Sequence, residues 1–271
     1  MDSIKKYTGG SLVLAWLLTL NVGVSVMLWL VNGLGAMMHL NTGWTFTWFA
    51  LSSGFMTFLT HPWTIVTYMV VQYGLLHLIF NVLWLYWFGL MLLDYRNERT
   101  LLYLYVGGGL AGGVCYVVAS LLMGYSGGWL AGASAAVLSM MTALAILCPN
   151  REIYLWLIGA VKLKWVAIVC IVLTLAGSGS LLAPNQLAHV GGILFGAIWA
   201  LGWKNFKRRT VEIGKKAPVK VRQTLRAMET HRADSVRLDE LLDKIRVSGY
   251  DSLTLRERTE LNEISSRMNR K

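Results

Sequence analysis

Six apolar runs, none of which contains Lys, Arg, Asp or Glu, dominate the first three quarters of the sequence. They span residues 11–33, 76–93, 101–123, 130–147, 165–177 and 186–203. A single segment that crosses hydrocarbon forms a helix, because its backbone polar groups are then hydrogen-bonded within the segment. Crossing about 30 Å of hydrocarbon takes roughly 20 apolar residues of such a helix. The runs therefore predict an all-α, polytopic membrane protein with a bundle of six transmembrane helices. The fifth run is the shortest, and Trp156–Val161 belongs either to it or to an interfacial segment.

The basic residues occupy alternate connections between these runs. All 25 Lys and Arg lie in four segments: 1–10, 94–100, 148–164 and 204–271. The remaining connections hold none: 34–75, 124–129 and 178–185. Because basic residues concentrate in cytoplasmic loops, a six-span path with both termini in the cytoplasm explains the pattern. We expect a multi-pass protein of the cell (inner) membrane.

Cysteine placement and net charge exclude two other classes of protein. Cys115, Cys148 and Cys170 lie within or at the ends of the runs, so no disulfide framework is expected. The net charge of +11 comes from segments that flank the membrane, where basic residues usually face anionic lipid. The lipid bilayer is therefore an expected partner, and nucleic acid is not.

Few ionisable side chains fall inside the predicted spans, where burying them is costly and usually has a functional reason. Of the five histidines, only His77 and His189 do so. The acidic residues before the tail all fall on the predicted cytoplasmic side: Asp2, Asp94, Glu98 and Glu152. A site near the outer face must therefore work without a carboxylate.

Four polar residues from three spans share one predicted depth near the outer face. The fourth span enters near Leu130, which places Ser134 about 6 Å below the edge at 1.5 Å per residue. His189 lies at a similar depth in the sixth span. His77 begins the second span, with Asn81 one turn deeper on the same face. We expect these four side chains to meet.

A serine within hydrogen-bond reach of a histidine can be a nucleophile, because the imidazole accepts the hydroxyl proton. Ser134 and His189 would form such a dyad, without the third member of a triad. His77, Asn81 and the backbone N–H of Ser134 would donate to the oxyanion of a tetrahedral intermediate. Taken singly, a membrane serine more often bonds a helix carbonyl, and an intramembrane histidine can be a packing group. The shared depth favours a site.

Small residues line the spans that carry Ser134 and His189. Gly132 precedes the serine, and Gly191, Gly192 and Gly196 follow the histidine. Faces of small residues let two helix backbones approach closely, so they fit a serine that reaches a histidine on another helix. The glycines of 107–113 on the third span are expected to serve packing.

Three segments, in this order along the chain, resemble the rhomboid intramembrane serine proteases. They are HLIFNVLWLYWFG at 77–89, GASA at 132–135 and AHVGGILFG at 188–196. The resemblance implies a six-helix bundle of the bacterial type, with a site that opens to the extracellular or periplasmic side. Two positions depart from the family pattern: Ala135 stands where glycine is usual, and Leu138 stands where an aromatic residue is frequent.

The same resemblance implies a role for each of the four polar residues. Ser134 would be the nucleophile, and His189 the general base and acid. His77 and Asn81 would stabilise the oxyanion. The aromatic-rich segment 34–75 is either a structural hairpin in the headgroup region or a lateral element beside the substrate entrance.

The sequence predicts four regions: a cytoplasmic N-terminus at 1–10, the membrane domain at 11–203, a basic linker at 204–220 and a small helix-turn-helix-like tail at 221–271. In the tail, Thr254 and Glu257 have the spacing of a capping box. The tail resembles a short cytoplasmic helical domain attached to some bacterial rhomboids. Its mixed charges favour docking of an unidentified partner over DNA binding.

We therefore expect a serine endopeptidase that hydrolyses peptide bonds of transmembrane substrates near the outer membrane face. No cofactor or metal is expected, because the HExxH pattern of zinc proteases is absent. Two alternatives stay open. A catalytically silent rhomboid-like protein would bind membrane clients without cutting them, and a small transporter would use the polar residues as a pathway.

Overall fold

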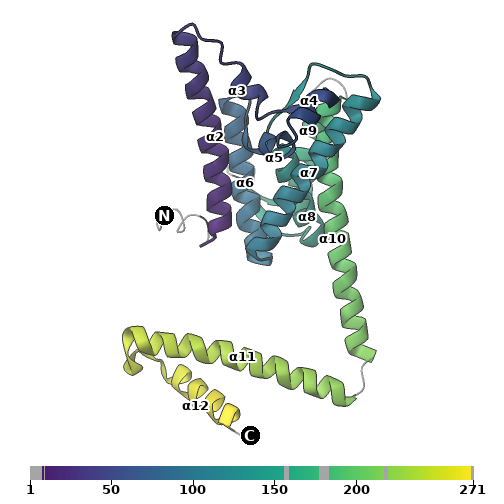
Figure 1. Cartoon of the computed structure of the whole chain (residues 1–271). Coiled ribbons are helices and arrows are strands. Elements are labelled where there is room, and N and C mark those ends of the chain that lie inside the picture. Colours follow the sequence, from purple (N-terminus) through teal and green to yellow (C-terminus); the bar gives the residue numbers. More distant parts are fainter. Residues whose placement is uncertain (1–7, 9, 156–158, 177–182, 217–218, 270–271) are drawn as a thin grey trace. The chain divides into compact units, whose positions relative to one another are not determined.

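The computed structural model describes residue 8 and residues 10–155, 159–176, 183–216 and 219–269. The chain divides into two compact units, residues 1–204 and residues 205–271, which are described separately. Four helices are long and apolar enough to cross a membrane: α2 (Leu12–Met37), α6 (Leu75–Tyr95), α7 (Glu98–Leu122) and the Pro184–Phe206 part of α10 (Pro184–Lys216) (Figure 1).

Two shorter apolar helices, α8 (Ser134–Leu147) and α9 (Leu163–Ala176), occupy the fourth and fifth predicted runs. The structure thus has an apolar helix at each of the six predicted runs. The prediction of an all-α membrane bundle is confirmed. The crossing of the membrane by the two shorter helices remains a prediction.

The helix of the fourth run begins later than expected. Leu130 belongs to strand β2 (Trp129–Leu130), which pairs antiparallel with β1 (Leu51–Ser52). Gly132 has a φ of 126°, a conformation that favours glycine and that an α-helix excludes. Ser134 is therefore the first residue of α8, and the prediction that the helix of the fourth run begins near Leu130 was wrong.

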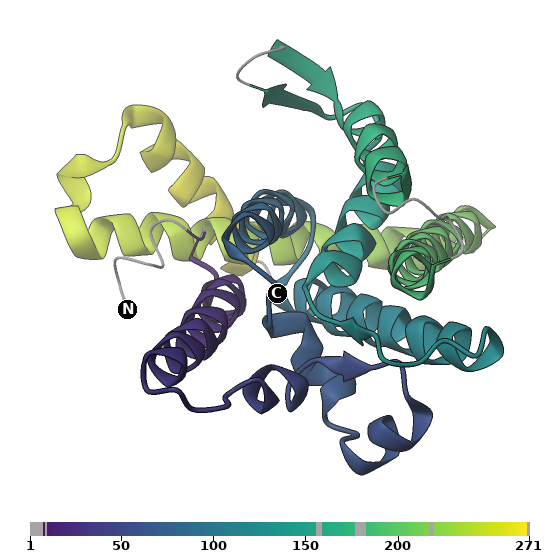
Figure 2. The ribbon, with the colours of Figure 1, turned by 90° about the horizontal axis from the view of Figure 1, so that it is seen from above.

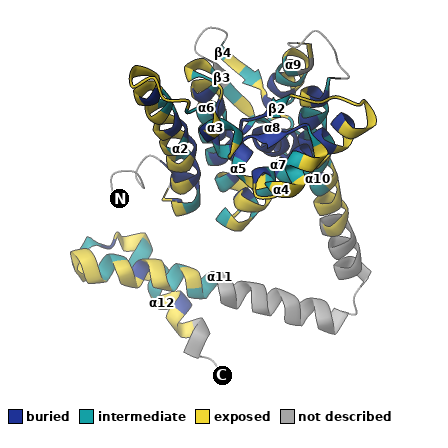
Figure 3. Cartoon of the chain, turned by 45° about the horizontal axis from the view of Figure 1, so that its top comes forward, coloured by how far each residue is buried: buried dark blue, intermediate teal, exposed yellow. Residues whose placement is uncertain are grey.

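The short helix α8 lies at the centre of the first unit. Every residue from Ala135 to Leu144 is buried, and α8 packs against α6, α7 and α9. Figure 3 shows the buried residues gathered on α8 and on the inward faces of its neighbours, with exposed residues on the outer faces. A helix that is apolar on all sides needs such surroundings. Neighbouring helices, rather than lipid, thus surround α8.

Glycines let α8 touch two neighbours through the backbone. A Cβ at Gly192 of α10 would collide with the carbonyl oxygen of Ala135, and one at Gly196 with that of Ser139. A Cβ at Gly112 of α7 would likewise lie 2.6 Å from the Cβ of Ala135. These contacts explain why Ala135 fits where the family usually has glycine, because the facing positions are themselves glycines.

The segment between α2 and α6 folds into short elements along one side of the bundle, from the end of α2 towards α7 (Figure 2). Besides β1, these are α3 (Trp44–Thr47), α4 (Phe55–Thr60), α5 (Thr64–Thr67) and the 3-10 helix η1 (Tyr68–Val70). The indole N–H of Trp63 donates to the carbonyl of Trp48 at 2.8 Å, and the Tyr68 hydroxyl donates to the carbonyl of Gly109 on α7 at 2.7 Å. The first of these hydrogen bonds holds the segment together, and the second anchors it to α7.

A second antiparallel ladder, which the sequence did not predict, separates α8 from α9. Strand β3 (Glu152–Leu155) pairs with β4 (Gly159–Lys162). Residues 159–161 are therefore strand rather than part of the fifth helix, whereas residues 156–158 lie outside the described residues. Just before β3, Arg151 forms an ion pair of 2.6 Å with Asp94 at the end of α6.

The second unit contains a helical hairpin: α11 (Val219–Ser248), η2 (Tyr250–Ser252) and α12 (Leu255–Asn269). Leu241 and Ile264 are buried between the two long helices, and Gly249, with a φ of 79°, ends the first of them. Because α10 continues to Lys216, most of residues 204–220 are helical.

The capping box predicted in the tail is confirmed. The Glu257 carboxylate accepts a hydrogen bond from the Thr254 N–H at 2.8 Å, and the Thr254 hydroxyl accepts one from the Glu257 N–H at 3.3 Å. Lys244 on α11 also donates to Glu257 at 2.7 Å. Together with Thr254, the Lys244 ammonium lowers the pKa of Glu257 to about 2.

Replacing Gly196 by alanine should lower the stability of the membrane unit by about 1–3 kcal/mol, because its methyl group would push α10 away from α8. The matched control is Gly202→Ala, on the same helix, where a Cβ meets nothing within 4 Å. That control should leave stability unchanged or raise it by up to about 1 kcal/mol through helix propensity. Thermal unfolding in detergent measures both, and equal melting temperatures would contradict the close contact.

The tail should loosen in acid. A carboxyl whose pKa is lowered on folding stabilises the fold above its unfolded pKa of about 4.3, and this stabilisation is lost as the pH falls towards about 2. Pepsin should therefore cut the Glu257→Gln tail readily at pH 4, where the wild-type tail resists. Glu263→Gln, which changes an exposed carboxylate on the same helix, is the control. Equal cleavage of wild type and Glu257→Gln at pH 4 would contradict this role.

Candidate active site

The structure brings Ser134 and His189 together across two helices. Ser134 is the first residue of α8, and His189 lies in the second turn of α10. The serine Oγ is 2.8 Å from the histidine Nε2, a normal hydrogen-bond distance. The direct contact of α10 with α8 at Gly192, three residues after the histidine, sets this distance.

A third residue, Gln186, hydrogen-bonds the histidine of this pair and was not predicted from the sequence. The Nδ1 atom of His189 lies 3.0 Å from the side-chain oxygen of Gln186, whose side chain is buried. An amide oxygen only accepts, so Nδ1 carries the proton and donates it there, which leaves the lone pair of Nε2 for the Ser134 hydroxyl. The signal was present as an (i, i+3) pair in one helix. It was missed because only carboxylates were considered as a third member.

His77 lies against the turn that precedes Ser134. A Cβ at Gly132 would lie 2.6 Å from Cε1 of the His77 ring, so only glycine fits there. Within the described part of the chain, the buried Nδ1 of His77 has no hydrogen-bond partner. A buried polar atom without a partner is costly. His77 therefore presents an unused polar atom next to the serine turn.

Asn81 lies one turn beyond His77 on α6, and both of its amide hydrogens are engaged. They are donated to the side-chain oxygen of Gln72 and to the carbonyl of His77, each at 3.0 Å. Asn81 lines the same pocket as Ser134. To donate to an oxyanion it must release one of these two acceptors, so the hydrogen bonds at Asn81 have to rearrange during any such reaction.

A buried chain of polar groups continues from Asn81 to the first helix. Gln72 donates to the Asn21 side-chain oxygen at 3.1 Å, and Asn21 donates to the Tyr105 hydroxyl at 2.9 Å. The Tyr105 hydroxyl donates in turn to the carbonyl of Met69 at 3.3 Å. This chain was not predicted, because Gln72 lies outside the predicted spans and no spacing rule connects it to Asn21. It fixes Asn81 relative to α2 and α7.

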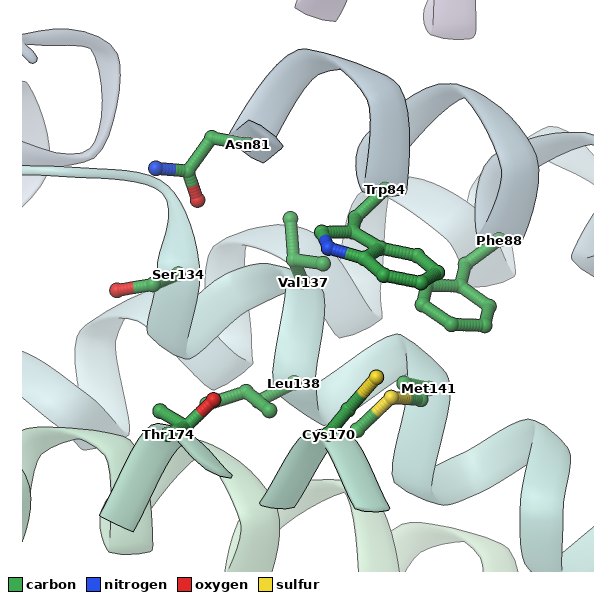
Figure 4. A pocket seen from close by; sticks show the side chains of 9 residues that line it. All are labelled: Asn81, Trp84, Phe88, Ser134, Val137, Leu138, Met141, Cys170 and Thr174. Carbon is green, nitrogen blue, oxygen red and sulfur yellow. The ribbon is translucent and has the colours of Figure 1, made fainter. Parts of the chain in front are cut away.

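An apolar pocket of about 70 Å³ opens beside Ser134, between α6, α8 and α9. Figure 4 shows Ser134 at one side of it, with the hydroxyl directed away from Phe88 and Met141. Leu138, which replaces the frequent aromatic of the family, lines the pocket together with Trp84. A small or medium apolar group fits such a space next to the serine.

Two family matches fall in the two compact units of the chain, one mainly in residues 1–204 and one in residues 205–271. Residues 59–206, more than half of the chain, match the Rhomboid domain. Residues 229–267, in the helical hairpin, match a family of unknown function, DUF6576. A comparison with curated proteins gave no match. The matched residues include α6 to α9, the first part of α10 and all four predicted site residues. This chain therefore belongs to the rhomboid family of multi-pass membrane proteins.

Proposed function

We propose that the protein is an intramembrane serine protease that hydrolyses peptide bonds of transmembrane proteins. The observation that carries this proposal is the hydrogen bond of 2.8 Å between Ser134 Oγ and His189 Nε2, with Gln186 behind the imidazole. A serine that serves only packing does not require a histidine partner. A histidine that serves only packing does not require an acceptor that fixes its tautomer. Membership in the rhomboid family supports the same reaction class.

The reaction proceeds by acyl transfer. His189 Nε2 takes the hydroxyl proton as Ser134 Oγ attacks the scissile carbonyl, and a tetrahedral intermediate forms. The imidazolium then gives this proton to the departing amine, which leaves an acyl-enzyme. Water, deprotonated by the same nitrogen, attacks the ester, and the proton returns to Ser134 when the acid product leaves. The Gln186 amide oxygen holds the ring in place during both half-reactions.

The first turn of α8 supplies part of the oxyanion stabilisation. Ala133, the residue that caps this helix, offers no side-chain acceptor, so the N-terminal amides of α8 have no capping group. Amides at a helix N-terminus point towards the position where negative charge develops, and their dipoles favour it. His77, with its unused Nδ1, and Asn81 are the proposed side-chain donors.

The basic residues support an orientation with both termini in the cytoplasm of the cell (inner) membrane. In Figure 1 the α6–α7 turn, which carries Arg96, lies at the opposite end of the bundle from α3 and α4. Strand β2, directly before Ser134, pairs with β1 of this second end. The proposed orientation thus places the serine towards the outer face. The Ser134–His189 contact favours a protease over a silent client-binding protein.

Replacing Ser134 or His189 by alanine should abolish cleavage of a single-span test substrate in liposomes, because each change removes a reacting group. Ser139→Ala is the matched control: this buried serine, on the same helix, bonds the carbonyl of Leu104 at 2.8 Å and lies outside the site. It should retain most of the activity. Cleavage that persists in Ser134→Ala would contradict the proposal.

Replacing Gln186 by leucine should lower kcat roughly 10- to 100-fold, as expected for loss of one hydrogen bond to a group that becomes charged in the reaction. KM should change little, because the amide oxygen bonds His189 and not the substrate. Gln186→Glu, which keeps an acceptor oxygen, should recover most of the rate. Unchanged kcat in a folded Gln186→Leu variant would show that the third residue has no role.

A further inference from the structure

An open pocket of about 490 Å³ lies where α6 turns into α7, far from the candidate active site in the fold. Asp94, Arg96, Thr100 and Trp203 are among the residues that line it. None of the proposed catalytic residues does so. The pocket lies at the end of the bundle that carries the α6–α7 turn in Figure 1, opposite α3 and α4.

Arg96 lines this pocket and carries a buried donor without a partner in the described part of the chain. Its guanidinium lies 4.2 Å from the centre of the Trp203 ring, which fixes it by a cation–π contact. Its Nε is buried and has no hydrogen-bond partner within the described residues, whereas its Nη1 donates a long hydrogen bond of 3.4 Å to the carbonyl of Tyr95. An arginine keeps its charge, so the pocket is lined by a fixed cation whose Nε has no acceptor among the residues that the structure describes.

The one carboxylate in the pocket lining is already engaged. Asp94 accepts an ion pair from Arg151 at 2.6 Å, and Arg151 also lies over the Tyr95 ring. Lys204, which directly follows Trp203 of the pocket lining, adds a third cation. Around the α6–α7 turn the net charge is positive, because four cations outnumber two carboxylates: Arg96, Arg99, Arg151 and Lys204 against Asp94 and Glu98.

An anion with several oxygen acceptors matches this arrangement, and phosphate is one that arginine binds through paired hydrogen bonds. The surroundings point to the phosphate of a lipid. Leu102 on α7, and Ile198 and Leu201 on α10, are exposed apolar residues on the helices that lead away from the pocket. These residues can contact the acyl chains of a lipid. Free phosphate has no acyl chains and would make no such contact. We propose that this pocket binds the phosphate headgroup of an anionic phospholipid through Arg96.

Native mass spectrometry of the full chain in detergent tests this proposal, with phosphatidylglycerol and phosphatidylcholine of identical acyl chains as probes. The wild type should retain phosphatidylglycerol preferentially. Arg96→Gln should weaken its binding about tenfold, the effect of one hydrogen bond between charged groups. Arg99→Gln is the matched control, since it removes the same charge from an exposed residue in the first turn of α7 that does not line the pocket. It should bind like the wild type.

Trp203→Leu, which removes the ring that fixes Arg96, provides a second test and should also weaken binding, even if Arg96→Gln fails to fold. Equal losses in Arg96→Gln and Arg99→Gln would overturn the proposal, because they indicate diffuse charge attraction. Displacement of the lipid by millimolar inorganic phosphate would likewise overturn it in favour of a free phosphate site. Unchanged binding in a folded Arg96→Gln would exclude the pocket altogether.

Discussion

The direct contact between the backbones of α8 and α10 is the constraint on which the site depends. Gly192 and Gly196 leave no space for a side chain against the carbonyls of Ala135 and Ser139. Because the two helices touch at these points, a side chain as short as serine reaches an imidazole on the other helix. Widening this gap by the radius of one methyl group would break the 2.8 Å contact.

In this membrane unit, neutral amides orient the residues of the site, a role that carboxylates often have in other proteins. Gln186 orients His189, and Gln72 with Asn21 positions Asn81. Burying a carboxylate among apolar helices carries a large desolvation cost, whereas an amide that is fully hydrogen-bonded carries much less. The amide chain also ties α2, which lies outside the matched Rhomboid domain, to a residue of the site.

Composition and motif order were enough to predict the helical membrane fold and the meeting of Ser134 with His189. Apolar runs directly predict burial in lipid. The two histidines within these runs, His77 and His189, are easy to identify. The start of α8 could not be predicted, because the pairing of Leu130 with a strand that begins 79 positions earlier is a tertiary contact within an apolar run. Gln72 and Asn21 were missed for a related reason: 51 residues separate them, and only the fold shows that they bond.

The most direct test of the account is to locate a covalent adduct on the protein. The wild type in detergent is treated with a fluorophosphonate, digested, and mapped by mass spectrometry. The activated hydroxyl of the Ser134–His189 pair should carry the adduct, while Ser139 and the other serines stay unmodified, and the adduct should disappear in His189→Ala. A folded wild type without an adduct, or with one on a serine other than Ser134, would contradict the assignment of Ser134 as the nucleophile.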